Sequence, residues 1–266
     1  MQIAAVQMVS TPDVGRNLEA AGRLIAEAAA AGAQLVALPE YFCLLGRQDT
    51  DKLDHAEAPG TGPIQAFLAD AARRHGVWLL GGTLPLRDGP GAQVLNSNGV
   101  YAPDGRLAAR YDKIHLFAFD NGRERYDEGR TLRAGSTPVA LQAGPLRVGL
   151  SICYDLRFPE LYRGLMQPPC DLLSVPAAFT YTTGRAHWEL LLRARAVENQ
   201  CYVLAAAQGG THENGRRTWG HSMVVDPWGE VVAVRPEGEG VVLAAVDPAR
   251  IAQVRQQLPA LAHRRL

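Results

Sequence analysis

A cysteine stands where an apolar run of the sequence ends. Residues 146–152 predict a buried strand, Cys153 follows at once, and Pro159 marks the first turn of a helix, a position that proline favours. At such a strand-to-turn-to-helix junction, backbone N–H groups can bind an oxyanion, and a helix N-terminus lowers the pKa of a thiol. The position therefore allows nucleophilic attack by Cys153, although the same pattern is typical of a buried core cysteine.

The other three cysteines carry weaker signals. Cys43 follows a possible site and could line a pocket, Cys170 precedes an apolar strand, and Cys201 begins one. The absence of a CxxC pair argues against a zinc cluster or a redox pair. Because the first residues do not resemble a secretory signal, we expect a reducing, cytoplasmic compartment and four free thiols.

A thiol nucleophile needs a base, and a carboxylate can serve if burial raises its pKa. Glu40 directly follows the apolar run 35–39, so it lies past the carboxyl end of a predicted strand, where open α/β sheets bind ligands. An exposed loop carboxylate is the alternative. Histidine is the commoner base, and His115, His187 and His221 are also candidates.

A lysine interrupts the apolar residues of the segment 110–117. A positive charge on Lys113 near the attacked carbon would stabilise a tetrahedral oxyanion and lower the pKa of a nearby thiol. The alternative is a surface lysine on an edge strand.

The elements that must position these side chains begin with a β-α-β pattern. Short apolar runs at 2–8, 34–38 and 77–81 predict strands. Helical spacing predicts one helix that Asp13 precedes and Gly32 closes, and another around 62–75. Such alternation favours parallel strands joined by crossover helices.

The rest of the chain mixes hairpins with further helices. Turns at 103–105 and 144–145 predict two hairpins. We therefore predict one domain that spans residues 1–266 and contains mixed sheets covered by helices. The predicted strands are 93–101, 106–111, 137–142, 146–152, 171–175, 201–206, 220–225, 230–235 and 241–246, and the predicted helices are 159–167, 185–199 and one that begins near Pro248.

The composition argues against several classes of partner. The chain has 27 basic and 27 acidic side chains, and without a basic excess we expect no binding to nucleic acid or to an anionic membrane. Its apolar stretches are short, so no transmembrane span is expected. No ligand-spaced His/Cys set and no GxxxxGK loop occurs, so we expect neither a metal nor an organic cofactor.

Three segments together resemble the nitrilase (carbon–nitrogen hydrolase) superfamily. Residues 38–42, 111–117 and 149–160 are similar to its glutamate, lysine and cysteine motifs, in the same chain order. The resemblance implies a catalytic set of Glu40, Lys113 and Cys153, a four-layer α-β-β-α sandwich of the α/β class, and a homodimer or higher homo-oligomer. Its contacts would involve the helices near 159–167 and 185–199, although the apolar spacing of 185–199 also suits a core helix.

The family pattern includes a second glutamate after the lysine. It maps onto Glu128, with Glu124 as the rival position. Residues 182–202 and 219–229 resemble the amidase branch that contains deaminated glutathione amidases and omega-amidases. The resemblance implies a small carboxylate-bearing amide as substrate, with deaminated glutathione first and 2-oxoglutaramate as the near alternative. A nitrilase, an N-carbamoyl amide hydrolase and an inactive scaffold protein are the other interpretations.

The mechanism follows as a hypothesis. Glu40 would take the proton of the Cys153 thiol and later give it to the leaving amine. Lys113 and the backbone N–H of Tyr154 would bind the oxyanion, and Glu128 would orient Lys113. The candidate substrate-binding side chains, for which ion pairing or loop packing is the alternative role, are Arg157, Phe179, Thr183 and Arg185.

Overall fold

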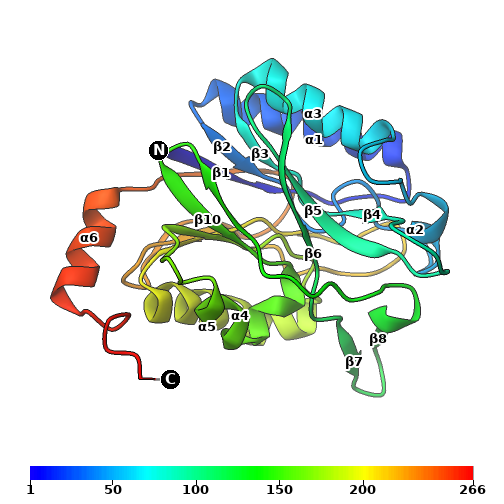
Figure 1. Cartoon of the computed structure of the whole chain (residues 1–266). Coiled ribbons are helices and arrows are strands. Elements are labelled where there is room, and N and C mark those ends of the chain that lie inside the picture. The colour runs from blue at the N-terminus through cyan, green and yellow to red at the C-terminus, as the bar shows by residue number, and fades with distance from the viewer. Residues whose placement is uncertain (266) are drawn as a thin grey trace.

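The chain folds into four layers (Figure 1). The computed structural model describes residues 1–265. Helices α1 (Val14–Ala30) and α3 (Pro63–His75) cover the outside of one sheet. Helices α4 (Pro159–Gly164) and α5 (Tyr181–Asn199) cover the outside of a second sheet that packs on the first. The predicted four-layer α-β-β-α sandwich is confirmed.

The first sheet is mixed and contains seven strands in the order β15-β1-β2-β3-β5-β4, with β6 paired to β5. The first three strands along the chain run parallel, as the β-α-β pattern predicted. Strands β15 and β5 run antiparallel to their neighbours. The strands are β1 (Gln2–Gln7), β2 (Leu35–Ala37), β3 (Trp78–Leu80), β4 (Leu84–Leu86), β5 (Leu95–Tyr101), β6 (Leu107–Asp112) and β15 (Gly240–Ala245).

The second sheet has six strands in the order β14-β13-β12-β11-β10-β9. Its central strands β10, β11 and β12 are parallel, and both flanks are antiparallel hairpins. The strands are β9 (Ala140–Ala143), β10 (Leu146–Leu150), β11 (Leu172–Ser174), β12 (Tyr202–Ala205), β13 (Ser222–Val225) and β14 (Val231–Arg235).

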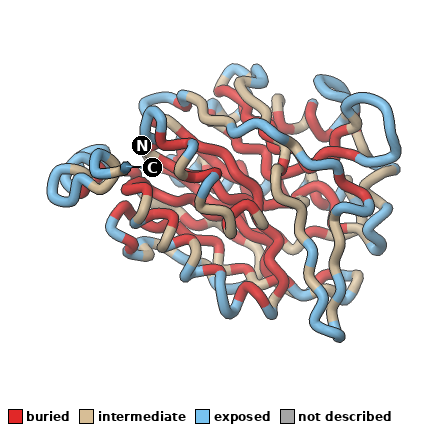
Figure 2. Tube along the Cα trace, turned by 60° about the horizontal axis from the view of Figure 1, so that its bottom comes forward, coloured by how far each residue is buried: buried red, intermediate tan, exposed pale blue. Residues whose placement is uncertain are grey.

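Alternation along the strands builds two cores. In β1, Ile3 and Ala5 face the second sheet, whereas Ala4 and Val6 face helices α1 and α3. This follows because successive side chains of a strand point to opposite faces. Figure 2 shows the result, with buried backbone through the central strands and exposed backbone in the outer loops. A strand buried on both faces reads as a continuous apolar run, which is why these strands were visible in the sequence.

Two helix boundaries differ from the prediction. Helix α5 begins at Tyr181, four residues before the predicted start at 185, because the Thr180 hydroxyl accepts a hydrogen bond from the Thr183 N–H and caps the helix. Helix α4 ends at Gly164 instead of 167. Both ends lie in polar or mixed sequence, where periodicity gives little signal.

Several short elements were not predicted. They are helix α2 (Asp51–Asp54), strand β4 and a hairpin of β7 (Ala118–Asp120) and β8 (Arg125–Asp127) that projects from the sandwich (Figure 1). Each has four residues or fewer, too short for a periodic pattern. Helix α6 (Pro248–Gln257) begins where the sequence predicted. Among the helices of residues 1–265, none combines the length and apolar character needed to cross a membrane.

One close approach beneath the candidate site requires glycine. Gly82 has φ +60°, and a Cβ atom there would lie 2.2 Å from the Pro39 carbonyl oxygen, next to Glu40. Gly60 has φ +79° but nothing within 4 Å of its Cβ position.

We therefore predict that Gly82→Ala lowers the free energy of unfolding by at least ~2 kcal/mol more than the control Gly60→Ala, which carries only the ~1 kcal/mol cost of a left-handed alanine. Urea unfolding measures both values. Equal losses in the two variants would contradict the packing role of Gly82.

Candidate active site

Cys153 lies at a sharp turn between the second sheet and its covering helix. Strand β10 ends at Leu150, and a single 3-10 turn, η2 (Cys153–Arg157), leads to α4. Cys153 has φ +49°, a left-handed conformation that is costly for a residue with a Cβ atom. Its N–H donates to the Pro176 carbonyl at 2.9 Å. In the described part of the chain, the N–H of Tyr154 donates to no carbonyl outside η2, so it is available to a ligand.

Glu40 follows strand β2, past its carboxyl end. The residue is 1% exposed, and three donors fix its carboxylate. Oε1 accepts hydrogen bonds from Lys113 Nζ at 2.8 Å and from the Asn96 amide at 2.9 Å. Oε2 accepts one from the Ala178 N–H at 2.9 Å. The alternative of an exposed loop carboxylate is therefore wrong, and Glu40 shares the wall of one pocket with Cys153.

Lys113 directly follows strand β6, and its side chain is completely buried. Its ammonium donates to Glu40 and, at 2.8 and 3.0 Å, to both oxygens of Glu128. The alternative of a surface lysine is therefore wrong. The rival residue Glu124 points elsewhere and accepts a hydrogen bond from the Thr182 hydroxyl at 2.9 Å. Of the two glutamates, the structure brings Glu128 to Lys113.

Opposing effects set the charges of this pair. Burial by itself would lower the pKa of Lys113, but the carboxylates of Glu128 and Glu40 outweigh it and hold that pKa above its usual range. Burial would likewise raise the pKa of Glu128, yet Lys113 and the hydrogen bonds from the Phe117 N–H and the Tyr41 hydroxyl keep it below the usual range. Both groups are ionised at neutral pH.

The thiol behaves differently from the sequence expectation. Burial, followed by the negative charge of Glu40, raises the pKa of Cys153 well above its usual range, whereas Lys113 acts in the opposite direction. The sequence had suggested a lowered pKa from a helix terminus and a nearby lysine. That expectation was wrong because it ignored desolvation and the adjacent carboxylate. In the free protein Cys153 is therefore a neutral thiol.

Asp155 joins the lysine segment to the cysteine turn. Its completely buried carboxylate accepts hydrogen bonds from the Tyr111 hydroxyl, the His115 ring and backbone, and the Ile152 N–H, at 2.7 to 3.0 Å. Sequence reasoning did not single out Asp155. Its signal was an acidic residue two positions after the cysteine, next to an apolar run, where a buried carboxylate needs several donors.

None of the three histidines considered as the base lines the pocket of Cys153 among the described residues. The His115 ring contacts Asp155 at 2.7 Å, His187 contacts Arg157 at 3.2 Å, and His221 contacts the Trp219 carbonyl at 2.9 Å. The carboxylate of Glu40 is thus the base candidate beside the thiol.

The pocket at Cys153, called the inner pocket, is lined by Glu40, Cys153, Arg157, Phe179 and Thr183 among others. The Arg157 guanidinium lies 5.3 Å from the centre of the Phe179 ring. Three predicted substrate-binding residues thus share one wall.

Arg185 does not join them. It is exposed on α5 and lines neither this pocket nor the one beside it, because the true start of the helix turns its side chain to the surface.

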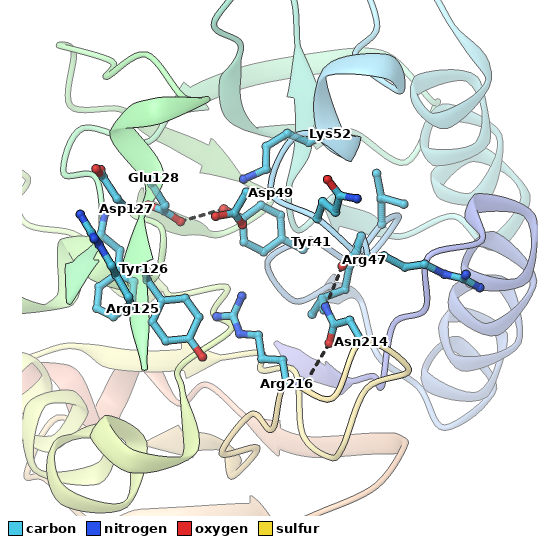
Figure 3. Close-up of a pocket in the computed structure, with 15 residues that line it drawn as sticks. Tyr41, Arg47, Asp49, Lys52, Arg125, Tyr126, Asp127, Glu128, Asn214 and Arg216 are labelled. Carbon is cyan, nitrogen blue, oxygen red and sulfur yellow. Dashed lines mark hydrogen bonds between the residues drawn. The ribbon is translucent and has the colours of Figure 1, made fainter. Parts of the chain in front are cut away.

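A second cavity, called the outer pocket, opens beside the first. Its wall includes Tyr41, Lys52, Tyr126, Glu128 and Arg216. Figure 3 shows these side chains, with the Tyr41 hydroxyl bonded to Glu128 at 2.7 Å. Sequence reasoning missed Tyr41, Lys52 and Arg216, together with Asn96 behind Glu40. Only Tyr41 had a local signal, because it directly follows Glu40 in the glutamate motif.

The arrangement suits acyl transfer. A thiol and a buried carboxylate border one small cavity, and a fixed cation is bonded to that carboxylate behind the cavity wall. Such groups can supply a nucleophile, a proton acceptor and stabilisation of an oxyanion.

Comparison with known proteins gives a concordant result. The family model described as carbon–nitrogen hydrolase matches residues 2–256. A deaminated glutathione amidase of Synechocystis sp. is 46% identical over 265 residues, covering 98% of this chain and 97% of that protein. An omega-amidase of Xenopus tropicalis is 39% identical and covers 99% of this chain and 95% of that protein.

A solved structure shares the fold as well. The crystal structure of Saccharomyces cerevisiae Nit3, described as a member of branch 10 of the nitrilase superfamily, superposes with a TM-score of 0.91 at 32% identity. The match covers 100% of this chain and 97% of that one. This chain therefore belongs to the carbon–nitrogen hydrolase family of the nitrilase superfamily, and it is a hydrolase of C–N bonds.

Proposed function

We propose that this enzyme is a thiol amidase that hydrolyses deaminated glutathione to 2-oxoglutarate and Cys-Gly. The observation that carries the proposal is the buried network of Glu40, Lys113 and Glu128 at the pocket of Cys153. The 46% identity to a deaminated glutathione amidase supports the choice of substrate.

In the acylation half, Glu40 accepts the thiol proton as the sulfur of Cys153 bonds to the amide carbon. The raised pKa of the thiol means that this transfer accompanies attack instead of preceding it. Lys113 and the N–H of Tyr154 bind the oxyanion. When the C–N bond breaks, Glu40 gives its proton to the departing nitrogen, so the amine leaves neutral and a thioester remains on the sulfur.

In the deacylation half, Glu40 takes a proton from water as the water oxygen attacks the thioester carbon. The C–S bond then breaks, the acid leaves, and the proton of Glu40 returns to the sulfur. Glu128 does not touch the reacting atoms in this scheme. It positions the ammonium of Lys113 through two hydrogen bonds and keeps it charged.

The side chains that line the inner pocket support its assignment to the keto acid half of the substrate. Arg157 offers a guanidinium that pairs with no carboxylate among residues 1–265, while Phe179 and Thr183 offer an apolar wall and a hydroxyl. 2-Oxoglutaramate has the same acyl half, and the omega-amidase relative at 39% identity makes it the second candidate substrate.

We further propose that the protein forms a homodimer in the cytoplasm. Helix α5 buries Trp188 and Leu192, so it is partly a core helix, but Leu190 on the same helix is 67% exposed and Val197 is 47% exposed. Apolar side chains at a surface favour a protein contact. The four cysteines are free thiols, which suits a reducing compartment.

Our first prediction here concerns substrate and nucleophile together. In a panel of deaminated glutathione, 2-oxoglutaramate, an N-carbamoyl amino acid and an aliphatic nitrile, deaminated glutathione should give the highest kcat/KM. Cys153→Ala should lose at least about 1,000-fold in kcat, as expected for a missing nucleophile.

Mass spectrometry of acid-quenched protein should show an acyl adduct that Cys153→Ala lacks. The matched control Cys170→Ala, another buried thiol outside both pockets, should retain it. A nitrile or carbamoyl substrate ranking first would overturn the proposed substrate, and an active Cys153→Ala would overturn the nucleophile.

Lys113 should matter for both stability and rate. Lys113→Met leaves Glu40 and Glu128 buried without their cation, which should cost about 3–5 kcal/mol in the free energy of unfolding. It should also lower kcat about 100- to 1,000-fold through loss of an oxyanion donor.

The double variant Lys113→Met/Glu128→Gln separates the two effects. It removes one of the uncompensated charges, so urea unfolding should show at least ~1 kcal/mol of recovered stability, with kcat still depressed about 100-fold or more. A double variant with nearly normal turnover would show that Lys113 is only structural.

The dimer proposal is tested at Leu190. Leu190→Glu places a charge in the proposed contact and should yield monomers, whereas the wild-type protein runs at twice the chain mass in size exclusion with light scattering. Leu107, 43% exposed on β6 of the other sheet, provides the control Leu107→Glu, which should remain dimeric. A monomeric wild-type protein, or a dimeric Leu190→Glu, would refute this interface.

A further inference from the structure

The outer pocket has no assigned role in the proposed chemistry, yet it lies directly beside the inner pocket. It has a volume of about 290 Å³. Phe117, Glu128 and Arg216 line both cavities, so the two are adjacent. With the acyl half of the substrate assigned to the inner pocket, next to Cys153, the outer pocket is the adjacent space for the other side of the scissile bond.

Charged side chains dominate the outer wall, but the anions are mostly engaged. Glu128 is bonded to Lys113, and Asp127 caps the N–H of Gly129 at 3.1 Å. Asp49 is exposed and is the remaining carboxylate in the wall. The cations in the wall are Arg47, Lys52, Arg125 and Arg216.

Lys52 is the half-buried cation of this wall. It lies on the short helix α2, with its ammonium 5.4 Å from the centre of the Tyr41 ring. Among residues 1–265 it makes no ion pair within 4 Å, and burial lowers its pKa, opposed in part by Asp49 and Glu128. A partly desolvated ammonium without a close counter-ion is a favourable site for an anion.

Arg216 stands where the two pockets meet. One guanidinium nitrogen donates to the Ala178 carbonyl at 2.8 Å, and the N–H of the same residue, Ala178, holds Glu40. The guanidinium also lies 5.1 Å from the centre of the Tyr126 ring. Its Nε is buried with no hydrogen-bond partner in the described chain, and it pairs with no carboxylate there. Buried donors of this kind normally have an acceptor, so the missing one points to a ligand.

Figure 3 shows Lys52 and Arg216 reaching the same pocket from different elements. We propose that the outer pocket is the leaving-group subsite, in which Lys52 binds the free carboxylate of a peptide-like amine and Arg216 binds a carbonyl oxygen nearer the scissile bond. This proposal deepens the proposed function and rests on it. Cys-Gly has both groups, a terminal carboxylate and an internal carbonyl.

The subsite would set specificity within the amidase branch. An omega-amide releases ammonia, which has no carboxylate and leaves the outer pocket empty. Deaminated glutathione releases a dipeptide that fills it. Binding energy from a part of the substrate remote from the scissile bond would then favour the larger substrate.

Lys52→Met tests the proposal in a comparison of three substrates. These are deaminated glutathione, the same compound with its terminal carboxylate converted to an amide, and 2-oxoglutaramate. In the wild-type enzyme, amidation should lower kcat/KM at least about tenfold, as expected for a lost charge-assisted hydrogen bond.

In Lys52→Met, the ratio of kcat/KM for deaminated glutathione to that for 2-oxoglutaramate should fall by a similar factor, and amidation should have little further effect. The matched control Arg123→Met removes one positive charge from an exposed residue that lines neither pocket, and it should keep the wild-type ratio. An unchanged ratio in Lys52→Met, or an equal fall in Arg123→Met, would overturn the proposal.

Calorimetry with deaminated glutathione keeps the test independent of turnover. The affinity of Cys153→Ala should fall at least about tenfold when Lys52→Met is added. Equal affinities, or no binding to Cys153→Ala, would overturn the subsite. A wild-type enzyme that binds deaminated glutathione through Lys52 but does not cleave it would instead overturn the proposed function alone.

Discussion

The burial of one ammonium group between two carboxylates governs the rest of this structure. Lys113 has no exposed side-chain surface, and an isolated cation in such a place would lose its charge. Glu40 and Glu128 prevent that, and each is itself fixed by other donors. Burial, followed by the interactions with Glu40 and then Glu128, raises the pKa of the Cys153 thiol, and Lys113 only partly opposes them. In this buried site, the protonation of each group thus depends mainly on the charges of its neighbours and little on bulk water.

The packing of the four layers brings these groups together. Glu40 follows a strand of the first sheet and Cys153 follows a strand of the second. Parallel strands in both sheets put their carboxyl ends at one edge of the sandwich, where open α/β sheets have their ligand sites. Asp155 then connects the two sheets at that edge, since its carboxylate accepts hydrogen bonds from Tyr111 in β6, from His115 just after β6, and from the cysteine turn. A shift of either sheet would break several buried hydrogen bonds together.

Much of this arrangement could be predicted from sequence, for identifiable reasons. Glu40 and Cys153 end apolar runs, so the position of each at a strand end was predictable, and the resemblance to a family linked them. The burial of Lys113 could not be predicted, because a lysine beside apolar residues fits an edge strand equally well. The choice between Glu128 and Glu124 depends on a loop with no periodicity. Lys52 and Arg216 carry no local pattern at all, since only the packing of segments far apart in the sequence brings them to one cavity.

The proposed chemistry also explains why a carboxylate would serve as the base beside the sulfur better than a histidine. An imidazole that accepted the thiol proton would leave a second cation next to Lys113, in a region with little water to screen the repulsion. In the proposed mechanism Glu40 instead becomes neutral when it accepts that proton, and the negative charge moves to the sulfur and then to the oxyanion. Lys113 touches Glu40 before transfer and lies close enough to Cys153 to lower the pKa of its thiol. Lys113 can therefore stay in place and stabilise the negative charge at each of these positions in turn. A fixed charge of this kind has no reorganisation cost during the reaction.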